Sequence, residues 1–308
     1  MTDLSIIILN YNSGVYLQKC LESINKSKIN KYKIEIIIAD NASTDTSFQN
    51  IQTIKSTNKQ ISFKFLHIEK NLGFATGNNR GLKVIDKDSK YVLFLNPDTV
   101  VESNTFAKMI SFFEKNEKVD AATCFIKLAI TGKLQPECHR GFPTPWRSFS
   151  YFTGLYKLFP KTNFFNGYFL GNLNTQKTHK IEACVGAFLM VKKNVGQEIN
   201  WWNEKYFFYG EDLDFCYQLF KRGYNLYFYP FCKITHFQGV SSGLISKSKN
   251  ISQASRQTKV KVALASTQAM KIFYQENLLK DYSFPMKSLV MSGIKILEFY
   301  RVSKAKYL

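Results

Sequence analysis

The chain has 308 residues, of which 45% are hydrophobic and 15% aromatic, a composition that predicts a folded protein of one extended domain or two. Lys and Arg (42) outnumber Asp and Glu (23), giving a net charge of +19, which indicates a polyanionic partner or reflects a lysine-rich genome. The sequence shows no signal peptide and no run of about 18 apolar residues that would span a membrane. Its six cysteines form no CxxC pair and are expected to be reduced thiols in the core. We therefore expect a cytoplasmic protein.

Strands and helices alternate in the first 100 residues. β-branched and apolar runs at residues 4–9, 34–39, 63–68 and 91–95 predict strands, and the spacing of apolar residues at 15–25 predicts a helix. This alternation indicates βαβ crossovers. The sequence therefore predicts an α/β fold with a Rossmann-like, mostly parallel central sheet flanked by helices.

Polar side chains follow each of these four expected strands. Because the carboxyl ends of parallel strands meet at one edge of a sheet, where ligands bind in open α/β folds, we expect these side chains to line one crevice. They are Asn10, Tyr11 and Asn12 after the first strand, Asp40, Asn41 and Ser43 after the second, Asn71 and Gly73 after the third, and Asn96 and Asp98 after the fourth. Ser43 or Asp45 is also expected to cap the next helix.

The stretch 91–99 suggests a cation site. Pro97 cannot donate to a strand ladder and disfavours a helical Asn96, so the strand has to end there and Asp98 lies just beyond it. A carboxylate on a rigid strand end is a good ligand for Mg²⁺ or Mn²⁺. The alternative is an ordinary turn, because Asn, Pro and Asp are common turn residues.

Three glycines, Gly73, Gly77 and Gly81, are expected in a loop before the next helix. Their spacing matches neither GxGxxG nor a Walker A motif. They serve either close packing of a helix on a strand or close approach of the backbone to a diphosphate, with which Arg80, beside Asn78, would pair.

The second half of the chain is less regular. Gly132 marks an expected hairpin, and residues 141–177, rich in aromatic residues, are read as a poorly packed insertion, a mobile acceptor-side loop or a surface that touches lipid head groups. A buried strand is predicted at 182–191 and a short one at 227–230.

Residues 211–223 predict a helix with Glu211 and Asp212 in its first turn and Gly223 as its cap. Stabilising the helix dipole is the structural alternative to a catalytic role for the two carboxylates. His236, taken alone, is either a buried structural histidine or a metal ligand.

Two helices are expected near the C-terminus, at 260–279 and 286–300. The second combines apolar residues with lysines. These helices either pack on the rest of the protein or form a basic amphipathic surface for a membrane.

The order of the motifs resembles that of family 2 glycosyltransferases of the GT-A fold, in particular the rhamnosyltransferase-like bacterial branch. The resemblance spans residues 4 to about 240 and implies a GT-A catalytic domain at 1–245, with a nucleotide-binding half at about 1–120 and an acceptor half at about 121–245, followed by a basic helical extension at 246–308. It is carried by Ile8-Leu9-Asn10-Tyr11-Asn12, Asp40-Asn41-x-Ser43-x-Asp45, Asn71-x-Gly73-x3-Gly77 through Gly81, Phe94-Leu95-Asn96-Pro97-Asp98, Phe207-Phe208-Tyr209-Gly210-Glu211-Asp212-Leu213-Asp214, and His236.

The resemblance also implies roles. Asp40 is expected to read the nucleotide base, Asp98 and His236 to hold Mg²⁺ or Mn²⁺, and Asp212 to act as general base, with Glu211 as its rival. Asn96-Pro97-Asp98 takes the place of an Asp-x-Asp motif and departs from it in the first residue. The expected nucleotide-sugar-binding residues are Asn10, Tyr11, Asn12, Asp40, Asn41, Asn71, Gly73, Asn78, Arg80 and Asn96.

The implied reaction is an inverting, metal-dependent transfer of a sugar, with rhamnose suggested by the branch, from a nucleotide diphosphate to a growing bacterial surface glycan or a lipid-linked acceptor. The expected location is cytoplasmic, with peripheral contact of the C-terminal helices on the inner face of the membrane. A non-catalytic protein that binds nucleotide sugars or polyanions is the alternative. Residues 10–13 argue against a nucleotidyltransferase, since they lack its Gly-rich basic signature, and no specific nucleic-acid motif is visible.

Overall fold

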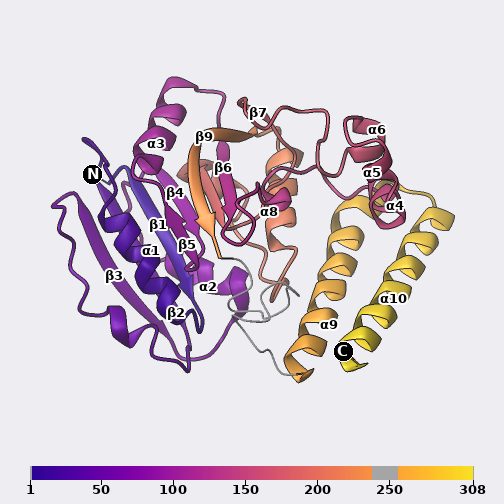
Figure 1. Cartoon of the computed structure of the whole chain (residues 1–308), viewed down its shortest axis with the longest axis horizontal. Helices are drawn as coiled ribbons and strands as arrows, with labels where there is room; N and C mark the ends of the chain where they lie inside the picture. Colours follow the sequence, from indigo (N-terminus) through magenta and orange to yellow (C-terminus); the bar gives the residue numbers. More distant parts are fainter. Residues whose placement is uncertain (1, 238–255, 308) are drawn as a thin grey trace.

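A computed structural model of the chain describes residues 2–237 and 256–307. Its nine strands form one sheet in the order β3-β2-β1-β4-β8-β6-β9-β5, with β7 paired to β9 (Figure 1). The strands are β1 Leu4–Asn10, β2 Ile34–Asn41, β3 Ile61–Ile68, β4 Tyr91–Leu95, β5 Thr99–Val101, β6 Ala121–Leu128, β7 His179–Lys180, β8 Phe188–Lys192 and β9 Leu226–His236.

Helices surround this sheet and extend beyond it on one side (Figure 1). The α-helices are α1 Val15–Asn25, α2 Gly73–Leu82, α3 Thr105–Lys115, α4 Pro145–Thr153, α5 Leu155–Leu158, α6 Asn163–Asn166, α7 Lys193–Glu198, α8 Glu211–Lys221, α9 Arg256–Phe273 and α10 Phe284–Tyr307. Short 3₁₀ turns lie at Gln49–Ile51, Pro136–Cys138 and Leu279–Asp281, and a π turn at Tyr274–Leu278.

The first four strands confirm the predicted parallel sheet. β1 pairs in parallel with β2 and β4, and β2 pairs in parallel with β3. The residues of β1 and β2 and most of those of β4 are buried because helices cover both faces, which explains their continuous apolar runs, whereas β3 at the edge of the sheet is largely exposed or half-buried. The register places Asn10 beside Asp40 and Asp40 beside His67, so one row of polar residues crosses three strand ends.

The second half of the sheet is partly antiparallel. β8 runs antiparallel between β4 and β6, and the long strand β9 pairs in parallel with β6 and antiparallel with β5. The strand predicted at 182–191 was too long, since β8 begins at Phe188. The preceding residues leave the sheet: Ala183 makes an isolated bridge to Arg140, and the Ala187 carbonyl accepts from the Asn96 amide beyond the end of β4.

The three glycines lie in helix α2, and the prediction of a loop there was wrong. A Cβ on Gly77 would come within 2.6 Å of the Leu9 side chain, and one on Gly81 within 2.8 Å of Ile7. A Cβ on Gly73, where φ is +81°, would meet the Phe207 carbonyl oxygen at 2.4 Å. The row of glycines therefore serves close packing of α2, the first of the two interpretations.

The C-terminal helices pack on the rest of the protein, the first of the two predicted behaviours. The segment after α9 is attached to α8, because Asn277 Nδ2 donates to Asp214 Oδ1 at 2.7 Å and the Tyr217 hydroxyl donates to the Asn277 carbonyl. α10 packs on α9, and within residues 284–307 only Ile294 is buried. The predicted domain boundary at 245/246 lies outside the described residues. No helix among the described residues is long and apolar enough to span a bilayer.

All six cysteines are buried and unpaired, as predicted for reduced core thiols. Burial raises the pKa of the Cys20, Cys138 and Cys232 thiols to about 12, so these groups stay protonated and unreactive at neutral pH.

Candidate active site

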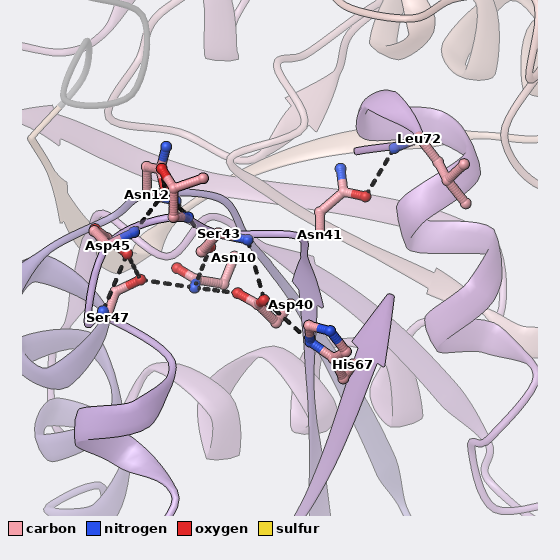
Figure 2. Close-up of polar contacts among 10 residues, drawn as sticks. Asn10, Asn12, Asp40, Asn41, Ser43, Asp45, Ser47, His67 and Leu72 are labelled. Carbon is pink, nitrogen blue, oxygen red and sulfur yellow. Dashed lines mark hydrogen bonds and ion pairs between the residues drawn. The ribbon is translucent and has the colours of Figure 1, made fainter. Parts of the chain in front are cut away.

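The ends of β1 and β2 form a dense polar network around Asp40, which Figure 2 shows. Asn10 Nδ2 donates to Asp40 Oδ1 at 2.8 Å and contacts the Ser43 and Ser47 hydroxyl oxygens at 3.0 and 2.9 Å. The Ser43 amide donates to Asp40 Oδ2 at 3.2 Å. Asp40 is 2% exposed and is thus fixed at the sheet edge by its neighbours.

Asn12 and Asp45 shape the adjoining loop (Figure 2). Asn12 Oδ1 accepts from the Thr44 and Asp45 amides at 2.7 and 3.2 Å, and Asp45 Oδ2 accepts from the Gly14 amide at 2.9 Å. The prediction that Ser43 or Asp45 caps a helix was wrong. The Ser43 hydroxyl oxygen accepts from the Asn12 amide and Asp45 Oδ1 accepts from the Ser47 amide, both within this loop. The next helical element is only a 3₁₀ turn, and no side chain caps it.

Asn41 connects β2 to the start of α2. Its Oδ1 accepts from the Leu72 amide at 3.0 Å, and its Nδ2 donates to Asn71 Oδ1 at 3.0 Å and to the Gly73 carbonyl at 3.2 Å. Asn71 Oδ1 also accepts from the Gly73 amide at 2.9 Å. These three predicted residues are thus brought together beside Asp40.

The structure does not bring Asn78 and Arg80 to the strand ends. Asn78 Nδ2 donates to the Phe74 carbonyl within its own helix at 2.9 Å. Arg80 is exposed, seven residues or about 10 Å along α2 from Gly73. Their distance from the polar network follows from the glycines being helical instead of forming a loop.

His67 belongs to the network and was not predicted as a site residue. Its Nδ1 lies 3.5 Å from Asp40 Oδ2, and its side chain is 60% exposed (Figure 2). Only the strand register, which pairs positions 40 and 67, could have identified it.

Asp98 and His236 meet as a buried pair at the end of β4. Asp98 Oδ1 lies 3.1 Å from His236 Nε2, and the two residues are 7% and 4% exposed. Antiparallel pairing of Thr99 with His236 sets this contact. Asn96 Nδ2 lies 3.4 Å from the same His236 nitrogen.

Gln135 determines how His236 presents this nitrogen. His236 Nδ1 lies 2.8 Å from Gln135 Oε1, an acceptor, so Nδ1 is the ring nitrogen that donates and Nε2 faces Asp98. A supporting residue of this kind orients a metal-ligating histidine. It was missed because a glutamine in an irregular segment carries no sequence signal.

The donor set of this pair fits a divalent cation. Two acceptor atoms facing each other at 3.1 Å need a positive charge, either a proton or a metal. Neighbouring ligands at about 2.1 Å from an octahedral ion lie about 3 Å apart. Mg²⁺ usually takes few protein ligands besides substrate phosphates, so two side chains would be enough to hold it. Among residues 2–237 and 256–307 no cluster of three or more His, Cys, Asp or Glu side chains suits a metal.

Asp212, in the first turn of α8, forms a buried ion pair. Arg140 Nη2 donates to Asp212 Oδ2 at 2.9 Å, and Arg140 Nη1 lies 3.4 Å from the Tyr168 hydroxyl. Burial alone would lower the pKa of the Arg140 guanidinium. The nearby Asp212 and Tyr168 have the larger combined effect and raise this pKa. Arg140 was not predicted as a site residue.

Glu211 differs from its neighbour. It is buried, and its Oε2 has no hydrogen-bond partner. Burial and the nearby charge of Asp212 raise the pKa of Glu211 to about 8. Glu211 therefore keeps its proton at pH 7, whereas a general base has to be able to accept one. This difference favours Asp212 over Glu211.

Residues 183–187 connect the surroundings of the Asp98–His236 pair with those of the Arg140–Asp212 pair. Ala183 exchanges backbone hydrogen bonds with Arg140, the partner of Asp212, and the Ala187 carbonyl accepts from the Asn96 amide, two residues before Asp98. Four residues span at most about 14 Å. Ala187, next to the Asp98–His236 pair along the backbone of Asn96, and Ala183, next to Arg140, are thus at most about 14 Å apart.

Two solved structures share this fold with the protein. Staphylococcus aureus TarS 1-349 in complex with UDP-GlcNAc has a TM-score of 0.54 at 12% identity, over 99% of this chain and 90% of that one. GalNAc-T7 with UDP, GalNAc and Mn²⁺ has a TM-score of 0.55 at 18% identity, over 77% of this chain and 44% of that one. These likenesses concern the fold, and they define the class: the protein has the GT-A fold of glycosyltransferases.

The sequence comparison identifies the family. The profile of glycosyl transferase family 2 matches residues 5–199, so the chain belongs to this family and is a glycosyltransferase, as its motifs indicated. The rhamnosyltransferase WbbL of Escherichia coli K12 is 24% identical over 245 residues, 75% of this chain and 82% of that protein. Two further bacterial relatives match over only 26% and 20% of their own length.

Proposed function

We propose that the protein is an inverting, metal-dependent transferase that moves a sugar from a nucleoside diphosphate to an acceptor hydroxyl. Family membership fixes the class of reaction. The observation that carries the proposal is the buried pair of Asp98 and His236, 3.1 Å apart at the end of β4. Rhamnose is the first donor sugar to test, because a relative that matches 75% of this chain over 82% of its own length is a rhamnosyltransferase.

The donor nucleotide would bind at the ends of β1 and β2. Asp40 would accept a hydrogen bond from an N–H of the base, with Asn10 fixing its position. Tyr11, 37% exposed at the same edge, is suited to stacking on the base. Asn96 would contact the ribose.

Asp98 and His236 would hold Mg²⁺ or Mn²⁺, and the imidazole ligand favours Mn²⁺. When bound, this ion would neutralise the diphosphate and make it a good leaving group. Gln135 keeps the Nδ1 proton of His236 in place, so that Nε2 faces the site.

Asp212 would take the proton of the acceptor hydroxyl as that oxygen attacks the anomeric carbon from the face opposite the diphosphate. One displacement of this kind inverts the anomeric centre and needs no covalent nucleophile. Arg140 would hold the Asp212 carboxylate in place through the 2.9 Å contact.

We place this chemistry in a catalytic domain at 1–245, whose halves meet near residue 120, followed by a helical extension at 246–308. The acceptor would be a growing bacterial surface glycan or a lipid-linked glycan. The protein would act in the cytoplasm, at the inner face of the membrane.

The test compares wild type, Asp98→Ala and the surface control Asp88→Ala. Melting temperatures are measured with UDP, dTDP and GDP, each with and without Mn²⁺ or Mg²⁺, and transfer is then assayed with the matching nucleotide sugars. A ligand at 100 times its Kd stabilises the native state by about 2.7 kcal/mol, so a metal-dependent shift with one nucleotide is expected.

Asp98→Ala should lose this shift and the transfer, while Asp88→Ala keeps both. NMR of the product should show an inverted anomeric centre. Metal-independent transfer, or full activity of Asp98→Ala, would overturn the metal assignment, and a retained anomeric configuration would overturn the single displacement.

A further inference from the structure

Helix α10 exposes an apolar stripe on the side away from α9. Leu289, Ile296, Tyr300 and Tyr307 are 67%, 70%, 59% and 83% exposed. Their spacing of 7, 4 and 7 residues places them within about 40° of one another around an α-helix, and Ile294, which is buried, points the other way. α10 is therefore apolar on two opposite faces, of which only one is covered by the described protein.

The charges around this stripe are all positive. Exposed Lys304 lies about 60° around the helix from Leu289, with its Nζ 5.9 Å from the centre of the Tyr300 ring, and exposed Lys295 and Lys306 lie on the flank of the helix, about 100–120° from Leu289. The single acidic residue of α10, Glu298, points toward α9, where its Oε2 accepts from Lys271 Nζ at 2.7 Å and from the Thr267 hydroxyl at 2.9 Å. The outer face of α10 thus combines exposed apolar groups with uncompensated lysines.

A second surface of the same kind lies next to this helix pair. Helices α4–α6 lie beside the end of the pair where α9 connects to α10 (Figure 1). The Ser148 hydroxyl of α4 is 2.7 Å from the Tyr274 hydroxyl, which also donates to the Pro143 carbonyl.

This second surface is also aromatic and basic. Residues 138–181 contain no Asp or Glu, and lysines at 157 and 161 are exposed. The exposed large side chains of this region include Trp146, Phe149, Phe152, Leu158, Phe159 and Phe164.

We propose that the outer face of α10 and helices α4–α6 form a docking surface for an anionic lipid membrane. Aromatic and aliphatic side chains flanked by lysines are what an interfacial helix presents to acyl chains and anionic head groups. From Leu289 to Tyr307 the stripe spans about 27 Å along the helix, enough for α10 to lie in the plane of the interface.

Charge favours a membrane over a second copy of the chain. A two-fold contact through the same stripe would bring the lysines of one copy against those of the other, with no acidic residue on the outer face of α10 to offset them. Anionic lipids offset these charges. The proposal depends on neither the donor nor the metal, so its failure would leave the proposed reaction intact.

The test is co-sedimentation of the full chain with vesicles of phosphatidylcholine alone or mixed with phosphatidylglycerol. Wild type should bind the anionic vesicles, and Leu289→Ser with Ile296→Ser and Tyr300→Ser should bind at least about tenfold more weakly. A control with Val84→Ser, Ile130→Ser and Phe231→Ser, which removes three exposed apolar side chains elsewhere, should bind like wild type.

Two further measurements test the parts of the surface. Replacing Lys295, Lys304 and Lys306 by Gln should weaken binding and its dependence on anionic lipid. Vesicles should shift wild-type tryptophan fluorescence to the blue, and Trp146→Phe should lose this shift.

Each other outcome overturns the proposal. The stripe variant should keep the melting temperature of wild type, since the replaced side chains are exposed, so that its loss of binding does not come from unfolding. If no vesicle binds wild type, or if the stripe variant binds as well as wild type, the surface has another role. If sedimentation in solution shows a dimer that the stripe variant abolishes, and vesicles do not bind, the occupant is a second copy.

Discussion

The two halves of the candidate site are built from contacts of very different range. At the donor end, Asn10 and Asp40 are 30 residues apart, and so are Asn41 and Asn71, because each βα unit repeats about every 30 residues. At the other end the partners are far apart in sequence: 72 residues for Arg140 and Asp212, 101 for Gln135 and His236, and 138 for Asp98 and His236. One half therefore follows from local regularity and the other from the completed fold.

The halves also differ in electrostatics. Both carboxylate oxygens of Asp40 have partners. The buried atoms without a hydrogen-bond partner at the donor end, Asn10 Oδ1 and Ser13 Oγ, belong to neutral side chains, whereas in the other half Glu211 Oε2 and Arg140 Nε belong to ionisable ones. Unpaired buried polar atoms are costly in free energy, and sites that keep them are often functional. We therefore expect substitutions in the half that holds α8 to affect the reaction most.

The largest expected effect separates Asp212 from Glu211. Asp212→Asn should reduce the transfer rate by about 10²–10⁴ while the donor nucleotide still binds, because a lost general base affects the chemical step. Glu211→Gln should cost less than about tenfold at pH 7, because a side chain whose pKa is about 8 is already neutral. Single-turnover transfer and nucleotide titration measure the two effects.

These two variants control for each other, since they are adjacent and each exchanges a carboxyl for an amide of similar size. If Glu211→Gln lost transfer as Asp212→Asn is expected to do, the base would be Glu211. The difference between the halves would then remain, but with the roles of the two carboxylates exchanged.

The second prediction tests the supporting residue Gln135. Gln135→Leu removes the acceptor for His236 Nδ1 and should weaken apparent Mn²⁺ affinity by about 10–100-fold, the usual effect of losing such a partner. Activity as a function of Mn²⁺ concentration measures it, and saturating metal should restore most of the rate. A lower rate at unchanged metal affinity would show that Gln135 does not act through the metal ligand.

The same division explains what the sequence could predict. The strands and the polar residues at their ends were found because apolar runs and Asn or Asp clusters are local features, and Asp98 and His236 came from the family motifs. His67, Gln135 and Arg140 were missed because each becomes a site residue only through strand register or a distant partner. The glycine segment was misread as a loop because glycine suits both a helix that packs closely on a strand and a loop that binds a diphosphate. Only the closeness of Leu9 and Ile7 in the folded protein identifies the packing role.

A smaller effect is expected at the donor end. Asp40→Asn should weaken nucleotide binding by about 10–100-fold, because a hydrogen bond to a charged group contributes about 1.5–3 kcal/mol. His67→Gln is the matched control, since it changes the neighbour of Asp40 at its exposed side and should cost less than about threefold. Calorimetric titration measures both. Equal losses would mean that His67 contacts the nucleotide as directly as Asp40.

The last prediction concerns stability and pH in the half that holds α8. The pKa of Glu211 is about 8 in the folded protein against 4.5 for an ordinary solvated glutamate, so between these pH values the folded state binds a proton that the unfolded state has lost. The stability that the protonated form contributes is therefore present below about pH 4.5 and is lost as pH rises toward 8.

The variant Glu211→Gln tests this, because its side chain at position 211 does not titrate. Its melting temperature should match wild type near pH 5 and exceed it by about 5 °C or more near pH 8.5. Glu117→Gln, at an exposed position, should show no such divergence. A parallel pH dependence of Glu211→Gln and wild type would mean that Glu211 is solvated, and the electrostatic contrast between the two halves would then rest on Arg140 alone.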